Sequence, residues 1–392
     1  MSGRMHRRGK LVLLFALLAG LSACEQKRVE QPPAEQKAES RIFNEKAAEA
    51  LTLEIWQAGE AQLADTRGAV EALERAVATL LEQPSEDHLE AAKLAWLQAH
   101  REFAATMPYI ELAFAPVELR GQGRQLLLAL DSWPVQPGYL DTVPGYSDSG
   151  IVNDTAIELT LVNLRKQHRL TAHEEASTGF HALEIMLWGP TSERSAEQFQ
   201  QVTEGEKPEA LAANRRRELT RLIGRGIAED VEGLARRWPT SANDLSRHYL
   251  ALSPASRLQQ IRAAHTRVLD EELLRRLPES SESDVESGRA ADSKLALLEI
   301  LDTLQSNWVP GEGHGLAELL LDRHQVAALT QTFSEVEELL LKMEDPVELA
   351  ELGQLAQARE LLEQMAGLMA GTAQVPVAAE DMTPVALPLD GE

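Results

Sequence analysis

Residues 179–189 read GFHALEIMLWG, and in this otherwise apolar run His181 and Glu184 stand three positions apart. Residues at this spacing lie on the same face of an α-helix, so the imidazole and the carboxylate point the same way. Burying two such groups is costly unless each finds a partner. The pair therefore predicts a polar site inside a helical protein, although a surface pair or a hydrogen-bonded core histidine gives the same short pattern.

The chain around this run is typical of an all-α protein. Apolar residues at positions 70, 73, 77 and 80 recur at spacings of three and four, which predicts an amphipathic helix that ends near Pro84. Ser85 can cap the next helix, with Glu86 and Asp87 in its first turn. No region alternates apolar and polar residues as strands do, and good helix formers dominate the composition.

The length of the chain allows two domains, and its composition indicates where they lie. We expect a first helical bundle over residues 45–200, which carries the His-x-x-Glu motif, and a second over residues 205–371. Within the first, residues 131–155 are rich in Pro, Gly, Asp and Ser and predict a loop long enough to have a function. Residues 372–392 are rich in Pro and Ala and predict a disordered tail.

The amino terminus reads as a lipoprotein signal peptide over residues 1–23. An apolar run over residues 11–19 is short for a membrane span, and residues 21–24, LSAC, read as a lipobox that ends at Cys24. The cations that precede the run are Arg4, Arg7, Arg8 and Lys10. Cleavage before Cys24 would make its thiol a lipid anchor in a membrane, with residues 24–44 as a flexible tether. An ordinary signal peptide beside a coincidental cysteine is the alternative.

The residue after the lipobox indicates which membrane holds the anchor. Glu25 follows Cys24, and because Asp is absent there, the usual inner-membrane retention signal is missing. We therefore expect the periplasmic face of the outer membrane rather than the inner membrane. Cys24 is the only cysteine, which excludes an intramolecular disulfide and a thiolate metal site.

The chain is strongly acidic. Its formal charge is −24, and removal of residues 1–23, which hold four cations and no acids, takes it to −28. Such a charge repels nucleic acid and anionic lipid headgroups, so nucleic acid is not expected as a partner. Solubility is the simplest reason for the charge.

Four segments in mid-chain together resemble one known family. The run over residues 179–189 resembles the Gly-x-His-x-x-Glu signature of the imelysin family, and residues 130–141 and 150–154 are similar to the turn and the Gly-Ile-Ile-Asn segment that precede it there. An earlier helix motif is matched as well, so the resemblance covers residues 96–189 in the family's order. Besides His181 and Glu184, the matching positions are Trp96, Phe103, Asp131, Trp133, Pro134, Tyr139, Asp141, Asn153, Gly179 and Trp188.

The resemblance implies two helical bundles packed side by side and a bacterial envelope protein. The family was first described as metallopeptidases and is often linked to iron supply. His100 stands where many members carry Arg, and because neutral imidazole binds metals whereas guanidinium does not, the site of the family is expected to be rebuilt there. Members of the family often carry a Glu and an Asp in the second half, and only Glu286 and Asp292 keep a comparable spacing here. Site residues are therefore not inferred from the second half.

A metal site needs more ligands than the motif supplies. His181 and Glu184 offer at most two, whereas zinc takes about four and iron about five or six. The further candidates are His100, Asp131 and Asp141, which belong to the neighbouring motifs. They can join the site only if the helices and the loop that carry them meet in the fold. Histidine with carboxylates suits iron, zinc or copper, and the spacing does not choose among them. The link of the family to iron supply favours iron.

Three functions fit these residues. The first is metal binding by a lipoprotein that takes up or scavenges iron in the envelope, together with a transport partner that the sequence does not identify. The second is an imelysin-type metallopeptidase, which we consider weaker because the His-Glu-x-x-His arrangement is absent and leaves no separate general base within the motif. The third is a purely structural buried pair in a partner-docking envelope protein.

Overall fold

The computed structural model describes residues 43–239, 245–279 and 286–371. The predicted signal peptide, Cys24, nearly all of the tether and the tail over residues 372–392 lie outside these described residues. Within them the structure consists of helices and connecting loops, and the only β pairing is an isolated bridge between Val143 and Tyr146. The predicted all-α fold is confirmed.

Helices of the amino-terminal half include the two longest of the described chain. In order they are α1 (Glu45–Glu82), α2 (Glu86–Ala113), α3 (Val117–Leu130), α4 (Pro137–Leu140), α5 (Leu161–Gln167), α6 (Phe180–Trp188) and the 3-10 helices η1 (Ala196–Phe199) and η2 (Pro208–Ala210). The carboxyl-terminal half continues with α7 (Ala212–Arg237), α8 (Leu245–Leu250), α9 (Pro254–Arg267), the π-helix η3 (Val268–Leu273), α10 (Leu274–Arg276), α11 (Ser293–Trp308), α12 (Leu316–Leu320), α13 (Arg323–Lys342), η4 (Val347–Leu349) and α14 (Leu352–Ala370).

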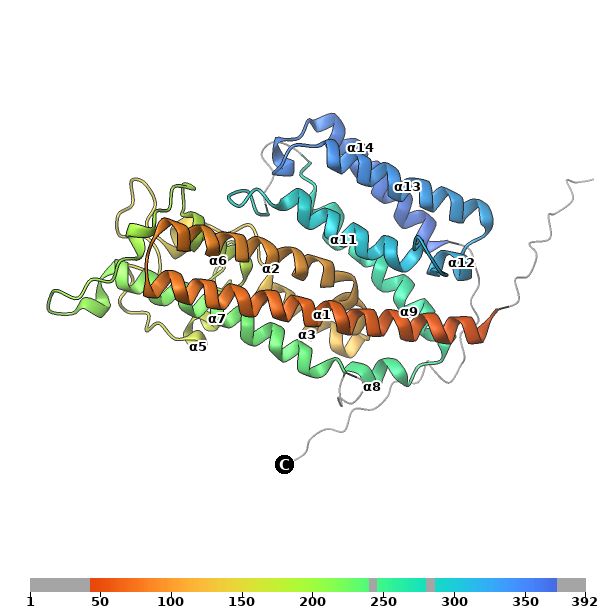
Figure 1. Cartoon of the computed structure of the whole chain (residues 1–392), viewed down its shortest axis with the longest axis horizontal. Coiled ribbons are helices and arrows are strands. Elements are labelled where there is room, and N and C mark those ends of the chain that lie inside the picture. The colour runs from red at the N-terminus through yellow and green to blue at the C-terminus, as the bar shows by residue number, and fades with distance from the viewer. Residues whose placement is uncertain (1–42, 240–244, 280–285, 372–392) are drawn as a thin grey trace, which may run out of the picture. The chain divides into compact units, whose positions relative to one another are not determined.

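The first group of helices is built on α1 and α2, which lie side by side (Figure 1). Leu73, Val77 and Leu80 of α1 are buried along one face, as their spacing predicts. The side chain of Ser85 accepts a hydrogen bond from the backbone N–H of His88, so this residue caps α2 as expected. Helix α6 packs against α2, and α7 packs against both α1 and α6.

The second group of helices shares α2 with the first. Helix α11 packs against α2 and α13, α9 packs against α1 and α2, and α14 packs against α9 and α13. Figure 1 shows α13 and α14 running beside each other at the end of the described chain. Because α2 contacts α6 on one side and α11 on another, its residues can meet side chains from both halves of the sequence.

The motif helix is short and has a glycine at each end. An irregular segment separates it from the preceding helix, α5. Gly179 precedes α6 with φ of +92°, and a Cβ atom there would lie 2.5 Å from the carbonyl oxygen of Leu130. Only glycine allows both this conformation and this contact, so Gly179 sets the start of α6 against the end of α3.

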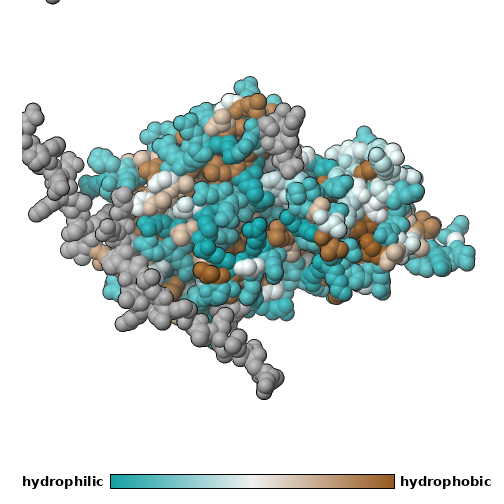
Figure 2. Space-filling view, turned by 180° about the vertical axis from the view of Figure 1, so that it is seen from behind, coloured by the Kyte–Doolittle hydropathy of each residue, from teal (hydrophilic) through white to brown (hydrophobic). Residues whose placement is uncertain are grey.

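The surface view in Figure 2 is mainly hydrophilic, with small separate hydrophobic areas. Among the described helices, none combines the length and the apolar character needed to cross a bilayer.

Candidate metal centre

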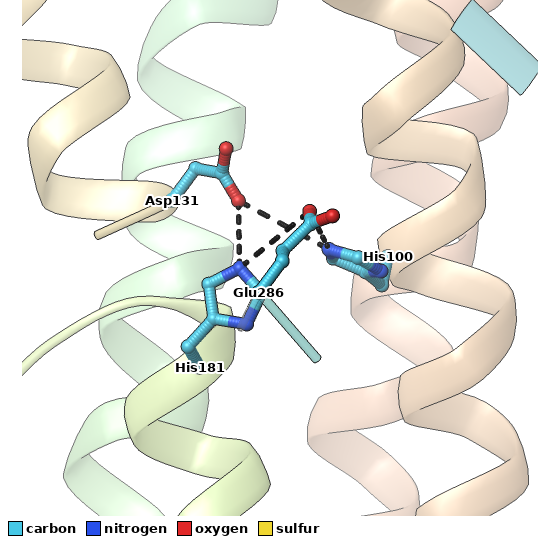
Figure 3. Close-up of side chains that lie close together, drawn as sticks. All are labelled: His100, Asp131, His181 and Glu286. Carbon is cyan, nitrogen blue, oxygen red and sulfur yellow. Dashed lines mark hydrogen bonds and ion pairs between the residues drawn. The ribbon is translucent and has the colours of Figure 1, made fainter. Parts of the chain in front are cut away.

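Four buried side chains from four separate segments meet between the helices (Figure 3). His100 lies on α2, Asp131 directly follows α3, His181 lies in the first turn of α6, and Glu286 precedes α11. Each offers one ligand atom, and these four atoms all lie within 4.8 Å of one another. No side chain of the four is more than 3% exposed. We call these four residues the ligand cluster.

The nearest atoms of the ligand cluster are the Nε2 atoms of both histidines and one oxygen of each carboxylate. His181 Nε2 lies 2.9 Å from Asp131 Oδ1 and 3.9 Å from Glu286 Oε1. His100 Nε2 lies 3.5 Å from Glu286 Oε1 and 4.0 Å from Asp131 Oδ1. Two nitrogens and two oxygens therefore face one small volume, as Figure 3 shows.

The imidazole of His100 is held from behind. Its Nδ1 atom lies 3.0 Å from Oδ2 of Asp292, whose other oxygen accepts a 2.7 Å hydrogen bond from Nε of Arg101. The ring of Trp96 stacks on the imidazole with 4.6 Å between centroids, and the indole N–H donates to the carbonyl oxygen of Phe180. These contacts leave Nε2 as the ring nitrogen that faces the ligand cluster. Such an outer carboxylate fixes the orientation of a ligating imidazole.

Glu184 holds His181 in the same manner and lies outside the ligand cluster. Its Oε2 atom lies 3.4 Å from Nδ1 of His181, on the ring edge that faces away from Asp131. Its Oε1 atom accepts hydrogen bonds from the backbone N–H groups of Arg289 at 2.9 Å and Ala290 at 2.8 Å. The two residues of the motif are both buried, but the geometry makes Glu184 an orienting group rather than a member of the ligand cluster.

A buried arginine touches both carboxylates of the ligand cluster. Nη2 of Arg276 donates to Oδ2 of Asp131 at 2.6 Å and to Oε2 of Glu272 at 3.0 Å, and Nη1 donates to Oε1 of Glu286. The Arg276 side chain is 1% exposed. Oε2 of Glu286 is buried and has no hydrogen-bond partner among the described residues.

Burial opposes every charge in this region, yet the ion pairs outweigh it. Burial lowers the pKa of His100, but hydrogen bonds with Asp292 and Glu286 raise it to about 10. Burial likewise lowers the pKa of His181, and its hydrogen bonds with Asp131 and Glu184 more than compensate. Burial raises the pKa of Asp131 and of Glu286, but the Arg276 charge and the histidines hold both pKa values below their ordinary range. His100 is therefore protonated and both carboxylates are ionised at neutral pH, and the raised pKa of His181 favours its protonated form more than in a free imidazole.

The ligand cluster fits a metal ion. Two imidazoles and two carboxylates form a nitrogen and oxygen donor set of the kind that iron, zinc and related transition metals accept. The carboxylates are already ionised but are paired with Arg276, and each imidazole has to release one proton before it coordinates. The unpartnered oxygen of Glu286 adds a buried acceptor that lacks a donor. These residues could hold a metal, and nothing in their chemistry identifies which one.

Asp141 lies apart from the ligand cluster, contrary to its expected place in the site. Its carboxylate accepts 2.6 Å hydrogen bonds from Nη2 of Arg194 and from Nε of Arg216. Burial raises its pKa, but these two arginines more than compensate, so the pKa lies below its ordinary value. Because both oxygens already pair with guanidinium groups, Asp141 ties the loop to α7 instead of facing His181.

The other positions of the resemblance support the loop and the core. The Tyr139 hydroxyl donates to the carbonyl oxygen of Gln167 at 2.8 Å, and the Asn153 amide donates to the carbonyl oxygen of Ser149 at 2.6 Å. Trp133, which precedes Pro134, is buried. The Trp188 ring meets Trp96 edge to face at 5.4 Å, while Phe103 lies in the core beside Phe180.

His168 stands beside charged residues in the sequence, yet its ring nitrogens contact the protein backbone. Its Nε2 atom lies 2.8 Å from the carbonyl oxygen of Leu128, and its Nδ1 atom lies 3.2 Å from the backbone nitrogen of Ser177. Burial lowers its pKa. The neutral imidazole therefore joins the end of α3 to the segment before α6.

Sequence reasoning undervalued Glu286 and missed Arg276. The spacing of Glu286 and Asp292 is visible in the sequence, and both residues now contact His100. Arg276 follows Glu272 by four residues, which is the ordinary pattern of a surface ion pair on a helix. No local signal distinguishes this buried arginine from an exposed one.

Comparisons with known proteins identify the family and agree with the helical fold. A family model described as Imelysin matches residues 59–375. Among solved structures, an imelysin-like protein from Psychrobacter arcticum 273-4 is similar, with a TM-score of 0.53 and 13% identity over 84% of this chain and 94% of that chain. A protein assigned as an iron-regulated protein A precursor from Parabacteroides distasonis ATCC 8503 has a TM-score of 0.57 and 14% identity over 83% and 94%. The search of curated proteins gives no match. At such identities the two structures show the fold alone.

Proposed function

The chain belongs to the imelysin family, whose model matches residues 59–375, and on that premise we propose that it binds iron in an uptake or scavenging role in the cell envelope. The family resemblance expected from the mid-chain motifs is confirmed by this match. The bound metal and the cellular location of the protein are what we propose.

One observation carries the proposal, namely the convergence of the four residues of the ligand cluster. Their ligand atoms lie within 4.8 Å of one another although the residues span positions 100 to 286 of the sequence. Bringing four polar side chains together in a core is costly, and a bound ion would repay that cost with ligand bonds. Outer carboxylates on both imidazoles, Asp292 behind His100 and Glu184 behind His181, are the second-layer contacts typical of metal-binding histidines.

Iron is the metal that we propose, ahead of zinc and copper. A set of two histidines and two carboxylates accepts iron readily, and carboxylate oxygens suit its harder ions better than they suit copper. One of the similar structures is assigned as an iron-regulated protein A precursor, which supports a connection with iron for this fold. Neither argument depends on how many ligands the bound ion takes.

The cellular location that we propose is the periplasmic face of the outer membrane, with a lipid at Cys24. It is supported by the basic and apolar residues before the lipobox and by Glu25 after it. The anchored chain would pass its ion to a metal-transport partner in the envelope. Labelled palmitate should enter the wild-type chain and not Cys24→Ser, and equal labelling of both chains would refute the anchor.

Hydrolysis, as in a metallopeptidase, is less well supported by the geometry. Glu184 is the carboxylate of the motif, and its oxygens already contact His181 and two backbone N–H groups, so it is not free to act as a general base. A substrate chain would also have to reach side chains that are at most 3% exposed. A peptidase would show chelator-sensitive cleavage of an unstructured protein that disappears in Glu184→Gln.

Metal analysis tests the proposal directly. The purified full-length chain, loaded with ferrous iron without oxygen and then desalted, should retain about one ion, and His181→Ala should retain far less. His173→Ala is the matched control, because this imidazole is 60% exposed and lies on the segment before α6. Equal iron in His181→Ala and in wild type would remove the ligand role of His181.

A purely structural role for the buried pair gives a different result. His181→Ala would then lower the thermal stability without any effect of iron on the wild type. A metal that binds only the folded state raises its stability, so unfolding with and without iron separates the two cases.

A further inference from the structure

Arg276 places a fixed positive charge against the ligand cluster. Its guanidinium contacts Oδ2 of Asp131 at 2.6 Å and Oε1 of Glu286, and its side chain is 1% exposed. Burial lowers the pKa of this group, but the charges of Asp131, Glu286 and Glu272 raise it above its ordinary value. The charge is therefore permanent at any pH at which the protein is folded.

A fixed cation beside a metal site acts more strongly on ions of higher charge. The repulsion between Arg276 and an incoming ion is proportional to the ion's charge, so a trivalent ion is repelled one and a half times as strongly as a divalent ion at the same position. The surroundings do not screen this repulsion well, because the ligand side chains are almost inaccessible to water.

We propose that Arg276 shifts the preference of the site from trivalent toward divalent ions, which favours the ferrous over the ferric ion at the proposed iron site. This inference rests on the proposed metal binding and adds the charge of the ion to it. The two carboxylates of the ligand cluster supply two negative charges, and Arg276, itself partly neutralised by Glu272, offsets part of them. A trivalent ion would leave a larger uncompensated positive charge in the core than a divalent ion would.

Glu272 lies outside the ligand cluster and partly neutralises the positive charge of Arg276. Its Oε2 atom lies 3.0 Å from Nη2 of Arg276 and 3.1 Å from Nη2 of Arg275. Removal of this carboxylate leaves the ligands intact and exposes them more fully to the charge of Arg276. Arg276→Met and Glu272→Gln should therefore change the ion preference in opposite directions.

Zn²⁺ and Ga³⁺ are suitable probes, because both have a filled d shell and neither changes its oxidation state in the experiment. Dissociation constants are measured on the full-length chain by competition with nitrilotriacetate. The ratio of the two constants in a variant is compared with the ratio in wild type, so the intrinsic preference of the ligands cancels. Arg275→Met is the matched control, since this guanidinium is 42% exposed and lies over the Trp133 ring at 4.2 Å without touching the ligand cluster.

The expected result is a gain in affinity for both ions in Arg276→Met, with the gain for Ga³⁺ about tenfold or more larger than the gain for Zn²⁺. Arg276→Lys keeps the charge and should retain most of the wild-type ratio. Glu272→Gln should shift the ratio further toward Zn²⁺, and Arg275→Met should leave it within about twofold.

Two results overturn the inference. One is a ratio in Arg276→Met that is the same as in wild type or in Arg275→Met. The other, which also decides the matter if Arg276→Met does not fold, is a ratio in Glu272→Gln that stays at the wild-type value. A wild-type chain that binds neither probe refutes the proposed function and this inference together, whereas wild-type binding with unchanged ratios refutes the inference alone.

Discussion

Nδ1 of His100 lies 3.0 Å from Oδ2 of Asp292, although 192 positions separate the two residues in the sequence. The contact joins α2 to the segment that leads into α11, and it turns Nε2 of the imidazole toward Asp131 and Glu286. The side chain of Asp292 makes no capping hydrogen bond to α11. Its contacts with His100 and Arg101 are therefore the reason to expect an effect on the site.

Asp292→Asn should lower the affinity for zinc, used as a probe, by about tenfold to a hundredfold, because the imidazole loses its charged partner and its fixed orientation. Competition with a chromophoric chelator measures the change. Asp302→Asn, an exposed position on α11, is the control and should bind as wild type does. An affinity in Asp292→Asn equal to that of the control would show that the contact does not support a ligand.

Metal affinity should rise with pH beyond the range in which an ordinary histidine titrates. The pKa of His100 is raised to about 10 and that of His181 is also raised, so protons compete with the metal for both imidazoles at neutral pH. In the metal-free chain, the stability that these protonated groups contribute is complete below about pH 6.5 and is lost as the pH rises toward 10. The rise in melting temperature caused by zinc should accordingly grow from pH 6 to pH 9. A plateau above about pH 7.5 would instead indicate unperturbed imidazoles.

Gly179→Ala should destabilise the fold by about 2 kcal/mol or more, because the new Cβ would lie 2.5 Å from the carbonyl oxygen of Leu130 at a φ that disfavours alanine. Gly68→Ala is the opposite case, since nothing lies within 4 Å of the added atom on α1, and it should stabilise the helix by about 0.5–1 kcal/mol. Chemical denaturation of both variants measures the two changes. Equal effects would mean that the close approach of α6 to the end of α3 is not tight.

Asp141→Asn should cost about 3–5 kcal/mol of stability at pH 7, because it leaves the buried charge of Arg194 and the charge of Arg216 without their carboxylate. The pKa of Asp141 is lowered, so its contribution is complete above the ordinary pKa of about 3.9 and is lost as the pH falls through the folded value. The difference between variant and wild type should therefore shrink in strong acid. Asp148→Asn, an exposed position on the same loop, should change stability by less than about 0.5 kcal/mol. Asp141→Asn should still bind metal. Loss of metal binding in this variant would show that Asp141 belongs to the metal site.

The sequence predicted the features that local geometry controls. Helical spacing placed His181 and Glu184 on one face, because the direction of a side chain on a helix is set by local backbone geometry. Motif proximity also brought His100 and Asp131 into the candidate set, and the structure places both beside His181.

Contacts between distant segments were harder to predict. Glu286 reaches the ligand cluster only because the chain before α11 returns to α2, and no spacing pattern encodes that return. Asp141 stands near the motif in sequence, but its partners Arg194 and Arg216 lie 53 and 75 positions away. These two arginines hold Asp141 outside the ligand cluster, and no local pattern in the sequence shows them as its partners.

Anomalous scattering from crystals soaked in ferrous iron is the decisive experiment for the proposed iron site. We expect one strong iron peak within bonding distance of Nε2 of His100 and Nε2 of His181, next to the carboxylates of Asp131 and Glu286. Full loading of the crystals without a peak at that position, or with peaks only at exposed carboxylates, would contradict it.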